Sequence, residues 1–195
     1  MTPLVPPQID PADALAAAAR FAATAEPDVA YAVVDSPVGA LVAAATPRGL
    51  VRLAYEDFNG GLDAVLTSLA GKLSPRILES PGRLDGVRRE LDEYFSGHRE
   101  AFDLPIDWSL YSAFGERVLR ATAAIPFGHT ATYGQVAAVA GNAKASRAAG
   151  RALGANPIPI VVPCHRVIGT SGKLTGYTGG MHRKEALLRL EGIAF

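Results

Sequence analysis

Residues 160–167 read Ile160-Val161-Val162-Pro163-Cys164-His165-Arg166-Val167, an apolar, strand-like run that stops at the only cysteine in the chain. His165 and Arg166 follow that cysteine with an imidazole and a guanidinium. A thiol attacks as the thiolate, and cationic or hydrogen-bonding neighbours stabilise that form near neutral pH. The run therefore predicts a nucleophilic cysteine. The alternative is that Cys164 is a small buried hydrophobic residue, a common fate of an unpaired cysteine.

Prolines surround the cysteine. Pro157, Pro159 and Pro163 each fix their own φ and disfavour the helical region for the preceding residue. We therefore expect an extended segment that supports the thiol rigidly. Successive side chains of an extended segment point to opposite faces, so direct proton transfer from Cys164 to His165 is awkward and a water bridge is easier.

Composition limits the class of protein. The 195 residues are 49% hydrophobic and 19% charged, as in an ordinary globular protein. No apolar stretch approaches the roughly 20 residues that span a bilayer, and the N-terminus has no basic-then-apolar signal pattern. We expect a cytoplasmic protein without membrane association. A lone cysteine forms no internal disulfide, and no cluster of Cys and His has the spacing of a structural zinc site.

Charge is divided unevenly along the chain. Residues 1–108 carry 9 Lys and Arg against 16 Asp and Glu, whereas residues 109–195 carry 10 against 3. A basic half favours contact with a polyanion. The alternative is that the two halves attract each other across their interface, and charge alone leaves both readings open.

The first half of the chain is predicted to form a small α/β scaffold. Residues 1–28 are expected to be an arm that ends in an alanine-rich helix over 12–24. β-prone runs, separated by turns containing Pro and Gly, follow at residues 30–34, 40–45 and 50–55. They predict an antiparallel three-stranded sheet, and apolar periodicity predicts covering helices at 62–73 and 84–95. This scaffold domain spans 29–96.

The second half is predicted to be mostly helical. After a linker at 97–110, the domain 111–195 has predicted helices at 112–125, 133–140, 145–155 and 183–190. The middle pair, joined at Gly141-Asn142, has the layout of a helix-turn-helix, and we expect a winged form. Most of one face of the helix at 145–155 is small, which allows close approach to a nucleic-acid groove. The small residues are Ala145, Ser146, Ala148, Ala149, Gly150 and Ala152, and the charged ones are Lys144, Arg147 and Arg151.

Five short motifs resemble one family in order and spacing. They are Thr132-Tyr133-Gly134, Ser146-Arg147-Ala148-Ala149-Gly150, Asn156-Pro157, Pro163-Cys164-His165-Arg166-Val167 and Gly176-Tyr177-Thr178-Gly179-Gly180. The chain is similar to the O6-alkylguanine-DNA alkyltransferases over residues 90–192, and only in general layout before that. Gly154 departs from the basic residue of some relatives, which puts phosphate contacts at that end in doubt.

The resemblance implies direct reversal of DNA damage. Cys164 would accept the alkyl group from O6 of guanine, and also from O4 of thymine, while Tyr133 donates toward N3 of guanine. His165, through water and polarised by Glu191, would remove the thiol proton. Asn156 is expected to orient the thiol, and Arg166 to bond nearby carbonyls. Because a thioether is stable, each molecule would act once, without a metal or an organic cofactor.

Double-stranded DNA is the implied partner. The helix at 145–155 would enter the minor groove, where Arg147 fills the stack after the target base is flipped out. The expected DNA-binding residues are Thr132, Lys144, Ala145, Ser146, Arg147, Ala148, Gly150 and Arg151. The expected substrate pocket consists of Pro163, Val167 (whose carbonyl accepts from the exocyclic amine of guanine), Tyr177 and Thr178. We expect a monomer, and cooperative assembly along DNA stays open.

Two other functions compete with this one. A Cys-His hydrolase would form an acyl intermediate on Cys164 with His165 as the base. A DNA-binding protein could instead flag lesions by flipping the base without repairing it. Relatives of that second type lack the acceptor cysteine, which is present here.

Overall fold

The computed structural model describes residues 10, 12–13 and 26–195. Most of the predicted arm, and the predicted helix over 12–24 apart from residues 12 and 13, lie outside the described residues. Within the described part, no helix is both long and apolar enough to cross a membrane.

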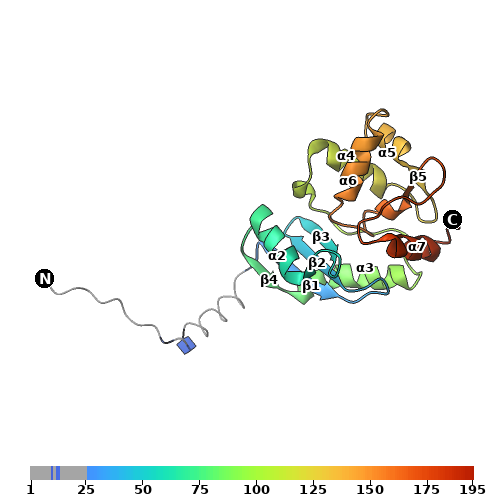
Figure 1. The fold of residues 1–195 in the computed structure, drawn as a ribbon. Helices are drawn as coiled ribbons and strands as arrows, with labels where there is room; N and C mark the ends of the chain where they lie inside the picture. Colours follow the sequence, from blue (N-terminus) through green and yellow to red (C-terminus); the bar gives the residue numbers. More distant parts are fainter. Residues whose placement is uncertain (1–9, 11, 14–25) are drawn as a thin grey trace.

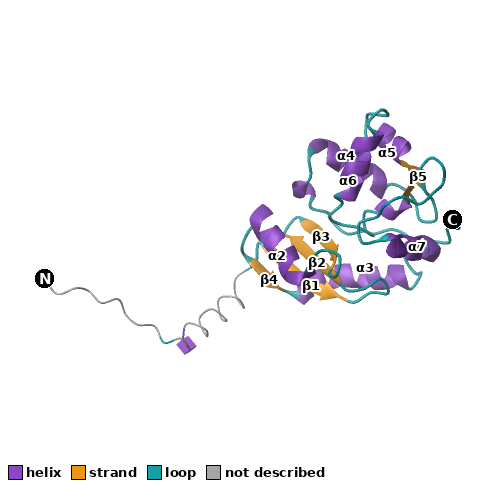
Figure 2. Ribbon diagram, viewed as in Figure 1, coloured by secondary structure: helices purple, strands orange, loops and turns teal. Residues whose placement is uncertain are grey.

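A four-stranded sheet forms the first half of the described chain (Figure 1 and Figure 2). Strands β1 (Val29–Val34), β2 (Leu41–Thr46) and β3 (Gly49–Tyr55) make the predicted antiparallel meander. A further strand, β4 (Ile77–Glu79), pairs in parallel with β1, so the order is β3-β2-β1-β4. The prediction of three strands was one short, because a strand of three residues is too brief to show alternation.

Alternation along the strands divides the core into two layers. Val42 and Val51 pack on one face with α2 (Gly61–Lys72), which is buried there through Val65 and Leu69. The neighbouring residues of the same strands point to the opposite face. That face packs against α3 (Asp85–Phe95), and its apolar cluster continues into the second half of the chain. The two halves therefore share one hydrophobic core.

The second half contains the four predicted helices. They are α4 (Ala113–Ala123), α5 (Tyr133–Val139), α6 (Ser146–Gly154) and α7 (Met181–Leu190). α5 starts with a capping box in which Thr132 and Gln135 each bond the other's backbone N–H, a strong signal for a helix start. Short strands β5 (Ala131–Thr132) and β6 (Val167–Ile168) pair in parallel. The helix bounds agree with the prediction to within two residues.

The segment predicted as a linker is attached to the sheet. Leu50 donates its backbone N–H to the Pro105 carbonyl at 2.8 Å and accepts from Asp107 at 3.0 Å. The Asp107 side chain, 2% exposed, accepts from Thr46 and Arg48. Burial raises the pKa of Asp107, but these hydrogen bonds outweigh burial and lower it to about 2. The division of the chain into residues 1–28, 29–96, 97–110 and 111–195 stays a prediction. Residues 97–110 are nevertheless hydrogen-bonded to the sheet and do not form a free linker.

The segment around the cysteine is bent, and the expected extended conformation is wrong. Ile160 has a φ of 74°, the only positive φ at a non-glycine position in the described chain. Val162 donates its N–H to the Ile158 carbonyl at 2.9 Å, and Cys164 opens a turn of 3₁₀ helix over Cys164–Arg166. Proline fixes a φ that turns also use, so the prolines allowed this path. The turns also pair buried backbone groups that no strand bonds.

Gly49 tests the attachment of residues 97–110 to the sheet. Its φ is 136°, and an added Cβ would lie 2.2 Å from the Pro105 carbonyl oxygen. We predict that Gly49→Ala lowers the free energy of unfolding by roughly 2 kcal/mol or more, from backbone strain and this clash. Urea unfolding followed by circular dichroism measures it.

Gly71→Ala is the matched control, since Gly71 lies in α2 with no atom within 4 Å of an added Cβ. It should leave stability unchanged or raise it by about 0.5–1 kcal/mol. Equal effects of the two substitutions would contradict the assigned role of Gly49.

Candidate active site

Cys164 is 6% exposed, and its sulfur accepts a hydrogen bond from a side-chain amide. Asn156 donates from Nδ2 to Cys164 Sγ at 3.1 Å and to the Val162 carbonyl at 2.8 Å. Its Oδ1 accepts from the Ile158 N–H at 3.0 Å. Because Asn156 lies two residues after the end of α6, it ties the end of that helix to the thiol.

The electrostatics of the thiol differ from the sequence-based expectation. Burial raises the pKa of Cys164 to about 11, and the Asn156 hydrogen bond and the nearby charge of Lys184 offset only part of that. His165 and Arg166 make no hydrogen bond to Sγ, and their side chains are directed to Glu191. The idea that these two neighbours stabilise the thiolate directly is therefore wrong. The resting thiol is protonated at neutral pH.

Glu191 lies at the centre of a buried hydrogen-bond network. It is 3% exposed and accepts from His165 Nε2 at 2.8 Å, from Tyr94 Oη at 2.7 Å and from Arg166 through Nε and Nη2 at 2.8 and 2.9 Å. Burial raises the pKa of Glu191, but bonds from His165 and Arg166 outweigh it and lower it to about 2. The carboxylate is ionised, and its pairing with Arg166 offsets the macrodipole, which disfavours an acid at a helix C-terminus.

His165 is held as a neutral imidazole. It is fully buried, and burial lowers its pKa despite the opposing influence of Glu191. The carboxylate accepts from Nε2, so we assign the proton to Nε2 and leave Nδ1 with its lone pair. Nδ1 is buried and has no hydrogen-bond partner among the described residues. His165, the residue after Cys164 in sequence, therefore carries a basic nitrogen, Nδ1, that has no hydrogen-bond partner among the described residues.

Lys184 is a further buried charge that the sequence reading missed. It is 1% exposed and donates from Nζ to the Val167 carbonyl at 2.6 Å and to the Thr175 carbonyl at 3.1 Å. Burial lowers the pKa of Lys184 to about 8. The Val167 carbonyl, predicted to bind the guanine amine, thus already accepts one bond. A carbonyl oxygen has two lone pairs, so it retains capacity for a second.

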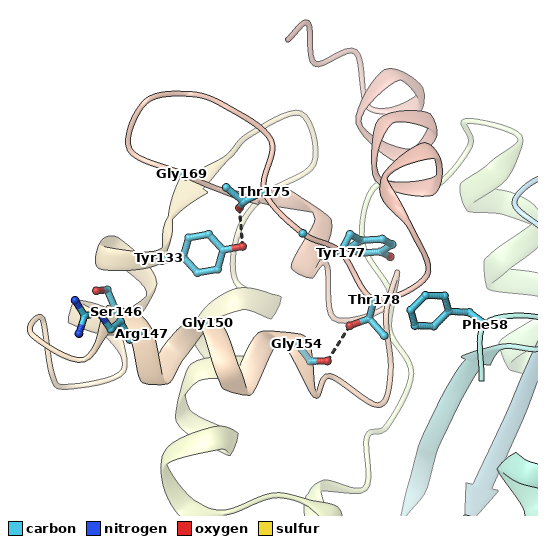
Figure 3. Close-up of a pocket in the computed structure, with 11 residues that line it drawn as sticks. Phe58, Tyr133, Ser146, Arg147, Gly150, Gly154, Gly169, Thr175, Tyr177 and Thr178 are labelled. Atoms are coloured by element: carbon cyan, nitrogen blue, oxygen red, sulfur yellow. Dashed lines mark hydrogen bonds between the residues drawn. The ribbon is translucent and has the colours of Figure 1, made fainter. Parts of the chain in front are cut away.

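A cavity of about 720 Å³ lies beside this network (Figure 3). Tyr133 at the start of α5 and Thr175 both line it, and their hydroxyl oxygens are hydrogen-bonded at 2.9 Å. Thr178 donates to the Gly154 carbonyl at the end of α6, at 2.8 Å. The lining residues come from both halves of the chain: Phe58, Tyr133, Ser146, Arg147, Gly150, Gly154, Gly169, Thr175, Gly176, Tyr177 and Thr178.

The cavity brings together only part of the predicted pocket. Tyr177 and Thr178 line it, and the Tyr177 ring lies edge-on to His165 with 6.4 Å between centroids. Cys164 and Val167 are buried and are not among its lining residues. Pro163 instead lines a separate cavity of about 490 Å³.

Three of the eight predicted DNA-binding residues, all on α6, line the cavity. They are Ser146, Arg147 and Gly150, and an added Cβ at Gly150 would make an ordinary van der Waals contact with the Tyr133 ring at 3.6 Å. The predicted positive residues are exposed: Lys144, Arg147 and Arg151. Ala145 and Ala148 are partly exposed, and Thr132 caps α5. Ala149 does not belong to the exposed small face, because it is fully buried in the core.

Arg166 has two functions where one was expected. It donates to the Ile125 carbonyl, as predicted, and it also pairs with Glu191. Among the described residues, no group of three or more His, Cys, Asp or Glu side chains is placed to hold a metal ion. A spacing signal for Lys184 did exist: Lys184, Leu187, Leu188 and Glu191 lie at i, i+3, i+4 and i+7, the positions of one helix face.

Known families match nearly all of the described chain. Residues 29–108 match the family model described as 6-O-methylguanine DNA methyltransferase, ribonuclease-like domain. Residues 113–193 match 6-O-methylguanine DNA methyltransferase, DNA binding domain.

Individual relatives agree with the family models. A methylated-DNA–protein-cysteine methyltransferase of Mycolicibacterium paratuberculosis is 44% identical over 84% of this chain and 92% of its own length. One from Methanosarcina acetivorans is 40% identical over 83% of this chain and 97% of its own. The crystal structure of Mycobacterium tuberculosis OGT in complex with DNA superposes with a TM-score of 0.73, at 40% identity, over 84% of this chain and 93% of that one. The chain therefore belongs to the 6-O-methylguanine DNA methyltransferase family.

Proposed function

We propose that this protein repairs alkylated DNA directly by moving the alkyl group from O6 of guanine to Sγ of Cys164. The observation that carries the proposal is a buried thiol that accepts a hydrogen bond from Asn156. Its chain neighbour His165 is kept neutral by burial and is oriented by a hydrogen bond to the ionised Glu191. Membership of the methyltransferase family and the DNA-bound mycobacterial relative support DNA as the substrate.

The reaction is a displacement at carbon. A C–S bond forms as the C–O6 bond breaks, and the electron pair of the broken bond goes to the departing guanine. The thiol proton ends on the guanine and the alkyl group on sulfur, so thiol and base alone balance the reaction. The thioether has no second thiol in the chain to release it, and each molecule therefore acts once.

The need to remove the thiol proton of Cys164 accounts for the buried hydrogen-bond network around Glu191. Because burial raises the pKa of Cys164 to about 11, a base must take the proton as sulfur attacks. Nδ1 of His165 is the candidate base, reached through water, and the Glu191 carboxylate stabilises the imidazolium that forms. Arg166 keeps Glu191 ionised, and the Tyr94 hydroxyl bonds the same carboxylate and orients it.

The cavity suits an extrahelical nucleotide. Its volume of about 720 Å³ is within the usual range for ligand sites, and Tyr133 presents a hydroxyl to it. That hydroxyl is placed to donate to the guanine ring as negative charge develops there. Lys144 and Arg151 supply positive charge for phosphates, and Arg147 occupies the rim where it can fill the vacated stack.

The stoichiometry of repair tests the proposal. We predict that a duplex with one O6-methylguanine is restored to guanine until one equivalent per protein has reacted, as measured by chromatography of digested DNA. Cys164→Ser should bind the duplex and restore nothing. Restoration beyond one equivalent would indicate a turnover catalyst, and preferential binding without restoration would indicate a protein that flags lesions.

The ionised Glu191 gives stability a defined pH dependence. Its folded-state pKa, about 2, lies below the ordinary value of 4.5, so its contribution is complete above pH 4.5 and is lost as pH falls toward 2. We predict that the free energy of unfolding declines more steeply over this interval in the wild-type protein than in Glu191→Gln, measured by urea unfolding. Glu185→Gln, on the same helix, should follow the wild-type slope; equal slopes for all three proteins would contradict the assignment.

Arg147 can be tested by separating base extrusion from chemistry. We predict that Arg147→Ala slows repair of duplex DNA roughly 10- to 100-fold, because extrusion costs a few kcal/mol that an inserted side chain partly offsets. Transfer from the free O6-alkylguanine base, which has no stack to leave, should keep its wild-type rate. Arg88→Ala, an exposed arginine on α3, is the control. An equal loss on both substrates would mean that Arg147 acts on the chemistry instead.

A further inference from the structure

We infer that Tyr55, at the end of β3 in the sheet domain, is a positioning residue for alkyl transfer that acts through Tyr177. The inference rests on the proposed function, because Tyr177 lines the cavity assigned to the flipped nucleotide. Tyr55 itself is fully buried and does not line that cavity. Its influence on the substrate therefore has to pass through another side chain.

The link is a hydroxyl pair between residues far apart in sequence. Tyr55 Oη and Tyr177 Oη lie 2.8 Å apart, and either can be the donor. The two rings meet edge to face with 6.2 Å between centroids. Burial raises the pKa of both hydroxyls well above the ordinary value, so both stay protonated and the bond is neutral. Removal of one hydroxyl leaves the other without this partner at a partly buried site.

Two further residues, Arg183 and Gly179, pack against the Tyr55 ring. The Arg183 guanidinium lies over it, 4.5 Å from the centroid. Gly179 approaches so closely that an added Cβ would lie 2.5 Å from the ring, and its φ of 109° also favours glycine. The segment that carries Tyr177 thus wraps around Tyr55.

Arg183 anchors this wrapping to the sheet domain. It donates to both carboxylate oxygens of Asp57, at 2.8 and 2.7 Å, and to the Val38 carbonyl at 2.7 Å. It also donates to the Gly179 carbonyl at 2.8 Å, within the segment that it holds. Tyr55 is therefore held in place by its neighbours, and its hydroxyl bond in turn fixes the position of Tyr177.

Tyr177 is the side chain through which that position reaches the chemistry. In Figure 3 it lies on the wall of the cavity beside Thr178, on the same side as Phe58 of the sheet domain. Its ring also meets His165 edge-on, at an interplanar angle of 87°. A shift of Tyr177 would therefore change both the cavity wall and the surroundings of His165, the proposed general base.

A double-mutant cycle tests the inference on the full-length protein. Tyr55→Phe, Tyr177→Phe and the double variant are compared in single-turnover transfer from duplex DNA that contains O6-methylguanine. Loss of a hydrogen bond worth about 1 kcal/mol predicts a rate at saturating DNA about 5-fold lower for Tyr55→Phe, with the half-saturating DNA concentration unchanged. Because the hydroxyls act as a pair, the double variant should be no slower than Tyr177→Phe alone.

Tyr111→Phe is the matched control, since that hydroxyl is buried and has no hydrogen-bond partner among the described residues. It should react at the wild-type rate, and melting temperatures of all variants identify any that fail to fold. A wild-type rate for Tyr55→Phe, or rate losses that multiply in the double variant, would overturn the inference. Absence of transfer by the wild-type protein is a different result, which would overturn the proposed function first.

Discussion

A single buried carboxylate joins the elements on which the site depends. Glu191, at the end of α7, accepts from Tyr94 of α3 and from His165 and Arg166 of the cysteine turn. A buried charge is stable only when it is paired and fully bonded, so these elements have to meet at one point. The same bonds orient His165 and leave Nδ1 without a partner among the described residues, as the proposed role of that nitrogen as a base requires. In the proposed mechanism, the interaction that holds α7 in the fold therefore also prepares the thiol for attack.

The sheet domain contributes more to the site than mechanical support. The backbone N–H of Leu53 donates to the Pro157 carbonyl at 2.8 Å, next to the asparagine that bonds the thiol. Tyr55 and Arg183 connect the same strand end to the wall of the cavity. The apolar core is also continuous across both halves, and Cys164 belongs to the same cluster as residues of β2 and β3. This explains how a chain with one nucleophile uses both halves for one reaction.

Prediction from the sequence succeeded where the signal is local. The helices and the three-stranded meander follow from apolar periodicity, and the Thr132 capping box marks the start of α5. It failed where distant residues decide the conformation: β4, the attached segment at 97–110 and the bend at Ile160. The thiolate argument failed for the same reason, because residues adjacent in sequence to Cys164 are directed to Glu191. Tyr94 gave no signal at all, since its partner lies 97 residues away.

The fate of the alkyl carbon decides whether Cys164 is an acceptor. The direct measurement uses duplex DNA with a deuterium-labelled O6-methylguanine, followed by proteolysis and tandem mass spectrometry of the peptides that contain Cys164. Transfer to sulfur predicts one labelled methyl group on Cys164 and unmodified guanine in the DNA. Labelled methanol with an unmodified Cys164, or label on another residue, would contradict direct transfer to this thiol.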